Sequence, residues 1–146
     1  MFIADLANAG AMPTLGAVLS FAGQRQRVLA HNVANLETPD YRPMDVSVSA
    51  FHAQLAQAVR DRRSRTGGEQ GELRLTPTDE VSQDARGAIH LTPGTASGNI
   101  LYHDRNNRDP ERLMQAIAEN QLMFRVATDL YRRQAEILRV AISQRA

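Results

Sequence analysis

The last 38 residues of the chain constrain its fold more than any other part. Asp109, Pro110 and Glu111 are typical of a helix start, because Asp caps free backbone N–H groups and Pro fits the first helical turn. Beyond them, apolar residues recur at alternating spacings of four and three, and a second row at spacing seven runs beside the first. The first row contains Leu113, Ile117, Phe124, Ala127, Tyr131 and Leu138, and the second contains Met123, Leu130 and Ile137. The pattern predicts one helix that ends near Ser143 and is roughly 50 Å long.

A helix of that length does not fit inside an ordinary globule of 146 residues, so other elements or molecules must cover its wide apolar stripe. A second seam near the N-terminus has the same spacing and consists of Leu15, Leu19, Ala22, Leu29, Val33 and Leu36. Pro13 can open that helix, and Pro39 should close it at Thr38 or slightly earlier. We expect the two helices to pair as an α-helical coiled coil, with Leu15, Leu19, Leu29 and Val33 facing Ile117, Phe124, Tyr131 and Leu138.

The middle of the chain has a different character. Residues 41–49 read as extended chain, and Phe51, Leu55 and Val59 suggest a short helix. Between residues 61 and 99 the large aliphatic residues are few, which predicts a loop-rich or partly disordered region. A small hairpin is suggested by two similar triplets of alternating residues, 73–75 and 89–91, each of which is followed by Thr-Pro. The predicted fold is therefore mainly α, with an N-terminal helical part at 1–38, an extended and loop-rich middle at 39–108 and a C-terminal helical part at 109–146.

Side chains that could carry chemistry are scarce. The chain has no cysteine and a net charge of +1, and every one of its 17 cations is Arg. Thiolate and Schiff-base catalysis are thereby excluded, and the charge gives little attraction for nucleic acid. The histidines, at 31, 52, 90 and 103, lack zinc-site spacing. We therefore predict no catalytic residues, no metal site, no cofactor and no enzymatic activity.

One basic cluster and the hydropathy pattern bear on partners. Residues 60–65 hold four arginines, which are best read as a solvated helix end, with contact to phosphates or to an acidic partner as the alternative. Aromatic interleaving and a recognition-helix motif are missing, so we expect no nucleic-acid binding. No stretch approaches the ~20 apolar residues of a membrane span, and the first residues lack the features of a cleaved signal, so we expect no stable membrane insertion.

The most specific local sequence lies at the end of the first helix and contains Asn32, Asn35, Thr38, Pro39, Asp40 and Tyr41. A plain helix stop would explain much of it. Its order also resembles the Asn-x-x-Asn-x-x-Thr-Pro-Gly-Tyr signature of the bacterial flagellar axial proteins, a family of rod and hook subunits, with Asp40 in place of Gly. Two further tracts, Gly98-Asn99-Ile100 and Ala118-Glu119-Asn120-Gln121, resemble C-terminal patterns of its short proximal rod members.

The resemblance implies a structural subunit of the proximal rod of the flagellar basal body, which spans the periplasm and transmits torque for motility. It implies self-assembly through the terminal helices and contacts with other copies, with neighbouring rod proteins and with FliE, the adapter between the rod and the MS ring. It also implies passage through the flagellar type III export apparatus without a cleaved signal peptide. Phe2 and Leu6 match the apolar pattern of early export substrates. Another short axial subunit is the first alternative, and a small helical adaptor or nucleic-acid-binding module is a second.

Overall fold

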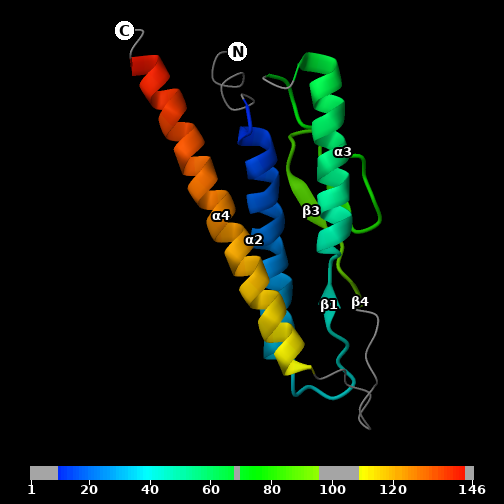
Figure 1. The fold of residues 1–146 in the computed structure, drawn as a ribbon. Helices are drawn as coiled ribbons and strands as arrows, with labels where there is room; N and C mark the ends of the chain where they lie inside the picture. Colours follow the sequence, from blue (N-terminus) through cyan, green and yellow to red (C-terminus); the bar gives the residue numbers. More distant parts are fainter. Residues whose placement is uncertain (1–9, 68–69, 96–108, 144–146) are drawn as a thin grey trace.

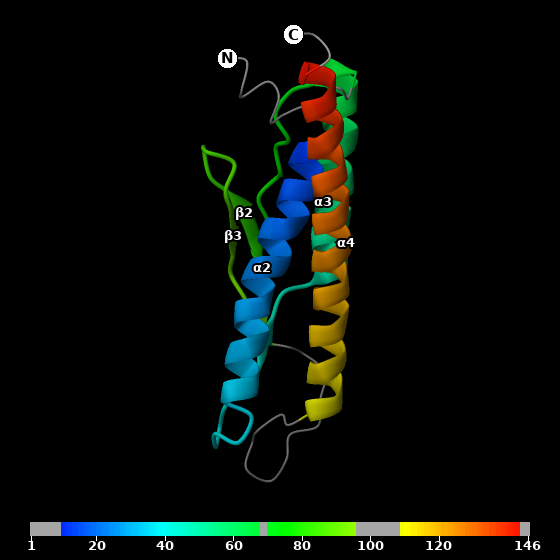
Figure 2. The same ribbon diagram turned by 90° about the vertical axis from the view of Figure 1, so that its left-hand side faces the viewer.

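The computed structural model describes residues 10–67, 70–95 and 109–143. Three long helices account for most of them, namely α2 (Met12–Ala34), α3 (Val48–Thr66) and α4 (Pro110–Ser143). The short strands are β1 (Met44–Asp45), β2 (Val81–Gln83), β3 (Ile89–Leu91) and β4 (Gly94–Thr95). In Figures 1 and 2, α2 and α4 lie side by side and run in opposite directions. The expected pairing of two long helices and the mainly α fold are confirmed.

The helix ends follow from local chemistry. Asp109 accepts a hydrogen bond from the Arg112 amide at 2.9 Å, so the predicted cap starts α4. Ser47 caps α3 by accepting the Ala50 amide at 3.1 Å, and Gly67 ends that helix at φ 75°. The extended segment expected over 41–49 therefore stops at Ser47, and α3 continues beyond residue 61, where loop was predicted.

A hairpin is present in the middle, but its pairing differs from the prediction. Strand β3 pairs antiparallel with β2, with Val81 opposite Leu91 and Gln83 opposite Ile89, whereas residues 73–75 form no strand. The Gln83 side chain instead accepts the Leu75 amide at 2.8 Å and donates to the Leu73 carbonyl at 3.2 Å. One amide side chain thus satisfies the backbone groups that a third strand would have paired. Strand β1 pairs antiparallel with β4.

The hydrophobic core lies between α2 and the middle of the chain. Phe21 of α2 and Phe51 of α3 are fully buried and stack with ring centroids 3.9 Å apart and planes 5° apart. The other buried members of this cluster are Ala17, Val46, Leu55, Ala58, Leu73, Leu75, Val81 and Ile89. The middle of the chain, which was predicted to be loop-rich or partly disordered, supplies most of this cluster. Its few large apolar side chains converge on a face of α2 that lies outside the predicted seam.

Candidate subunit interface

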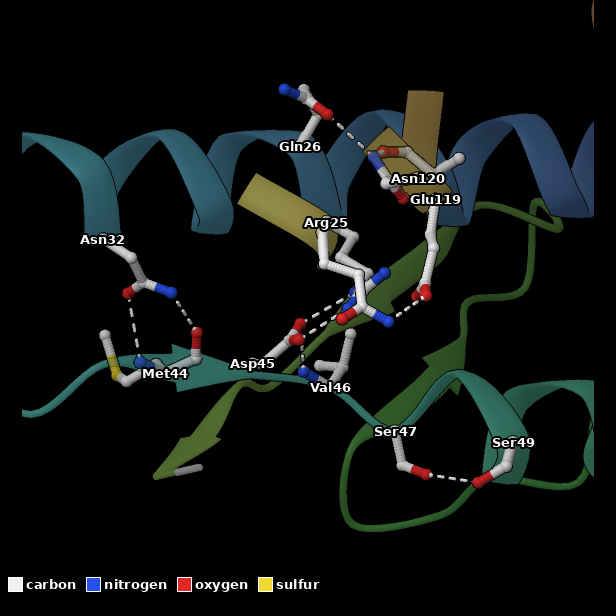
Figure 3. A network of polar contacts seen from close by, with 12 residues as sticks. Arg25, Gln26, Asn32, Met44, Asp45, Val46, Ser47, Ser49, Glu119 and Asn120 are labelled. Atoms are coloured by element: carbon white, nitrogen blue, oxygen red, sulfur yellow. Dashed lines mark hydrogen bonds and ion pairs between the residues drawn. The ribbon is translucent and has the colours of Figure 1, made fainter. Parts of the chain in front are cut away.

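The turn after α2 is built around Asn32, a buried residue of the last helical turn. Its side-chain amide donates to the Met44 carbonyl at 2.6 Å, and its side-chain oxygen accepts the Met44 amide at 3.1 Å. That oxygen also accepts the Tyr41 hydroxyl at 2.8 Å. One side chain thus pairs with both backbone groups of a strand residue twelve positions away, which fixes β1 against α2 (Figure 3).

The other signature residues shape the turn itself. Asn35 donates from its side chain to the His31 carbonyl at 2.9 Å and accepts the Thr38 hydroxyl at 3.3 Å. Asp40 adopts φ 57°, the left-handed conformation for which glycine is usual. Burial raises the pKa of Tyr41, so its hydroxyl remains protonated as the donor to Asn32 at neutral pH. The signature therefore performs a structural task.

A buried ion pair ties the next segment to α2. Arg25 is 5% exposed, and its guanidinium donates twice to the Asp45 carboxylate, at 2.8 Å from Nε and 2.6 Å from Nη2. Asp45 also accepts the Val46 amide at 2.8 Å. Figure 3 shows this pair between α2 and β1, close to the Asn32 contacts. Together the two polar links hold the start of the middle segment along α2.

Helix α4 packs against α2, and the most deeply buried side chain of α4 is polar. Its only buried residues are Asn120 and Ala127. Asn120 is 1% exposed and donates to the Ala22 carbonyl at 3.0 Å and to the Gln26 side chain at 2.9 Å (Figure 3). Its side-chain oxygen is buried without a hydrogen-bond partner. The position of α4 along α2 is thus marked by an amide rather than by a large apolar side chain.

The predicted seam on α4 is only partly buried. Phe124 is 44% exposed and Tyr131 is 36% exposed, which contradicts their placement inside the intrachain seam, while Ile117 and Leu138 are half-buried. On α2, Ala22 and Leu29 are buried, Val33 is exposed, and Leu15 and Leu19 are half-buried. Leu36, which follows the end of α2, is also half-buried. In the remainder of the α4 pattern Ala127 is buried, Leu113 and Met123 are half-buried, and Leu130 and Ile137 are exposed. The apolar spacing predicted the correct helix, and Asn120, which lies in line with the predicted seam, is the most deeply buried residue of α4.

Much of the apolar surface of α4 consequently faces outward. The exposed large side chains on this helix are Met114, Leu122, Phe124, Val126, Leu130, Tyr131, Ile137, Val140 and Ile142. Leu122, Val126 and Leu130 line one wall of a groove of ≈ 510 Å³. The rest of the lining consists of Leu15, Val18 and Arg25 of α2, Val48 and His52 of α3, and Glu119, Met123 and Ala127 of α4. Such a row of exposed apolar residues on a helix is typical of a surface that binds another protein chain.

The basic cluster at residues 60–65 is only partly as predicted. Arg62 from the basic cluster is buried and donates to the Gly10 carbonyl at 2.7 Å, so the reading of the whole cluster as solvated is wrong for this residue.

Phe2, Leu6, His103 and the Gly98-Asn99-Ile100 tract lie outside the described residues. Over residues 10–67, 70–95 and 109–143, no three metal-ligating side chains gather in one place. Within the same ranges, none of the helices is both long and apolar enough to cross a membrane.

Comparison with curated proteins finds relatives that are named flagellar basal body rod protein FlgB. The protein from Escherichia coli strain K12 is 30% identical over 114 residues, which cover 75% of this chain and 75% of the relative. The protein from Salmonella typhimurium strain LT2 is 31% identical over 113 residues, covering 74% and 75%. The protein from Bacillus subtilis strain 168 is 28% identical over 121 residues, covering 82% and 83%. No protein-family model matches the chain.

Proposed function

Because the chain belongs to the FlgB family of flagellar basal body rod proteins, we propose that it is a structural subunit of the proximal rod, that it assembles through its terminal helices, and that it transmits torque for motility. The observation that carries the proposal is the exposed apolar surface of α4. A soluble helix normally turns one stripe toward its own core. Here a helix of 34 residues buries two of them and leaves nine large apolar side chains exposed, which supports a role in contact with neighbouring subunits.

Torque transmission requires that a subunit resist shear between its parts. Two polar links join the middle segment to α2 in addition to the apolar core, namely Arg25 with Asp45 and Asn32 with Met44. Bidentate and doubly bonded contacts fix geometry more tightly than apolar packing alone. A load applied to α2 would therefore be passed directly to β1, which makes this corner of the molecule suitable for a rotating shaft.

The proposal extends to partners and location. Family membership supports contacts with other copies of the chain, with neighbouring rod proteins and with FliE, in a rod that spans the periplasm. Export would proceed through the flagellar type III apparatus without a cleaved signal, with Phe2 and Leu6 as part of the export signal. In this scheme the assembly regions are 1–38 and 109–146, and residues 39–108 lie between them. Catalysis has no place in the scheme.

Antibody or epitope labelling of purified basal bodies tests the location directly, and we expect label at the proximal rod. A matched pair of variants tests the role of α4. Phe124→Asp should abolish swimming and incorporation into basal bodies, because the carboxylate would be desolvated against a neighbouring subunit. Phe124→Leu keeps an apolar contact and should retain swimming. Both variants should keep the monomer's circular dichroism and thermal midpoint, because Phe124 is 44% exposed. Normal basal bodies containing Phe124→Asp would overturn the proposed role of this surface.

A further inference from the structure

One side of α4 carries a row of exposed residues that points away from α2. Successive residues of an α-helix are turned by ~100°, so residue numbers give their directions around the axis. The row, here called the outer row, consists of Leu122, Val126, Asp129, Leu130, Arg133, Ile137 and Val140, all of which are exposed. Its centre lies roughly 125° from the direction of Asn120 and Ala127, the two buried residues of the helix. The first three apolar residues of the outer row also belong to the wall of the groove described above.

The outer row is its own complement when the direction of the helix is reversed. Leu122 and Val140 lie nine residues to either side of position 131, and Asp129 and Arg133 lie two residues to either side. In an antiparallel pair of helices that is centred on position 131, residues at equal distances from the centre face each other. Leu122 of each copy then meets Val140 of the other. Asp129 of each copy likewise meets Arg133 of the other, so one register matches apolar with apolar residues and acid with base.

The two edges of the outer row extend this match. One edge is apolar and contains Val126, Leu130 and Ile137, whereas the exposed residues Arg125 and Glu136 lie along the other edge. Two-fold symmetry across an antiparallel pair brings each edge against the same edge of the other copy. In the register centred on position 131, Val126 therefore meets Ile137 of the other copy, and Leu130 lies close to its own equivalent. On the charged edge, Arg125 meets Glu136 of the other copy.

A parallel pair in register would lose these matches. Each residue of the row would then lie beside its own equivalent, so Asp129 would face Asp129 and Arg133 would face Arg133. The charged edge of one copy would also lie against the apolar edge of the other. Among the residues that the structure describes, none of the four charged side chains named above has an ion-pair partner within 4.0 Å, so their charges are available to a second copy. Charge complementarity therefore favours the antiparallel arrangement.

We propose that the free subunit forms a two-fold symmetric dimer in which the outer rows of two copies pack antiparallel, with Asp129 of each copy paired with Arg133 of the other. The partner is thus a second copy of this chain. Five apolar side chains in each row provide the attraction, and the charged residues select direction and register. A two-fold contact is closed and cannot extend a rod. The dimer is therefore a state of the subunit outside the rod, and it must separate before the outer row can meet neighbouring subunits.

Reversal of the central charges tests the contact on the purified chain. Asp129→Arg places two arginines at the centre of each row, and Arg133→Asp places two aspartates there. Like charges then face each other, so each single variant should raise the dimer dissociation constant, measured by sedimentation equilibrium, at least ~10-fold. The chain with both substitutions again brings opposite charges face to face and should dimerise like the native chain. An equimolar mixture of the two single variants should form a mixed dimer for the same reason.

Arg27→Asp is the matched control, because it makes the same change at an exposed arginine of α2, and it should leave the dissociation constant unchanged. All the substituted positions are exposed, so the circular dichroism spectrum should remain that of the native chain. A native chain that sediments as a monomer at every concentration would overturn the proposal, as would single variants that dimerise like the native chain. Failure of the doubly substituted chain to dimerise, while Arg27→Asp dimerises, would also overturn it.

Cysteine substitution tests the relative direction of the two helices, because the chain contains no native cysteine. Copies bearing Leu122→Cys should form disulfide-linked dimers with copies bearing Val140→Cys. Neither variant should link to itself, since equivalent positions lie ~27 Å apart along the antiparallel pair. Self-linked dimers of Leu122→Cys would show a parallel contact and refute the proposal. These measurements use the purified chain, so their failure would leave the proposed function intact, whereas loss of swimming on deletion of the gene tests that function alone.

Discussion

Replacement of Asp45 should cost more stability than replacement of the arginine with which it pairs. The two partners differ in exposure, since the Arg25 side chain is 6% exposed and the Asp45 side chain is 27% exposed. Asp45→Ala would leave the Arg25 guanidinium buried without its bidentate carboxylate, and the Val46 amide would lose its acceptor. Arg25→Met would remove the buried charge and leave a carboxylate that water can reach. The loss is therefore asymmetric, although the same pair is broken in both variants.

The magnitude follows from the burial of each group. Leaving one member of a buried ion pair unpaired costs roughly 3–5 kcal/mol, and partial access of water to Asp45 moves the estimate for Asp45→Ala to about 3 kcal/mol. For Arg25→Met, loss of two charge-assisted hydrogen bonds is largely offset by removal of the desolvation penalty, so we expect about 1 kcal/mol or less. The difference of about 2 kcal/mol corresponds to a separation of about 1 M in urea midpoint, for a slope near 2 kcal/mol/M.

Urea unfolding of the purified variants, followed by circular dichroism, measures this difference. Asp45→Asn is the informative control, because it keeps the shape and the acceptor for Val46 while it removes the charge. Its midpoint should lie between those of Asp45→Ala and the native chain. If the urea midpoint of Arg25→Met were equal to or below that of Asp45→Ala, burial of an unpaired guanidinium would not be the main energetic cost of breaking the pair. The reasoning would then fail.

Three further outcomes can be checked separately. Asp40 lies at φ 57°, so Asp40→Gly should be neutral or mildly stabilising, whereas Asp40→Val should lower the free energy of unfolding by about 1 kcal/mol or more. Asn120→Ala should cost about 1–3 kcal/mol, but Asn120→Leu should be nearly neutral, because leucine removes an orphaned buried oxygen along with the two hydrogen bonds. The Ala88 amide lowers the pKa of Asp84 below its usual 3.8, so the support that this carboxylate gives the hairpin turn should be present above pH 3.8 and lost as the pH falls through the lower folded-state pKa. Amide exchange at Ala88 should show this loss, and Asp84→Asn should abolish its pH dependence.

The two long helices were predictable because their signals are local. Asp109 and Pro110 define the start of α4, and a stripe of apolar residues at helical spacing is sufficient to predict the helix behind it. The signature turn was also recognisable from residue types alone, and the left-handed Asp40 stands at the position where the family signature has glycine. These local signals do not indicate which face of a helix packs against which neighbouring element.

The location of the core could not be read from the sequence for this reason. Phe21 lies outside the alternating seam of α2, and its stacking partner Phe51 is thirty residues away in a segment of weak pattern. Leu73 and Leu75 suggested a strand, since they alternate with polar residues, but alternation also results when an irregular segment turns every second residue inward. The pairing partner of β3 was missed because the Gln83 side chain occupies the backbone groups of Leu73 and Leu75.

The inward face of α4 illustrates the same limit. Asn120 interrupts the apolar seam of α4, yet it is among the most deeply buried residues that the structure describes. Leu113, Ile117, Met123 and Leu138 of α4 are half-buried, but nine other large apolar side chains of this helix are exposed in the subunit. The exposed side chains are not part of the core around Phe21 and Phe51, against which Met123 of α4 packs. Residues such as Phe124 and Leu130 are therefore available for the proposed contacts with neighbouring subunits at little cost to the stability of the monomer.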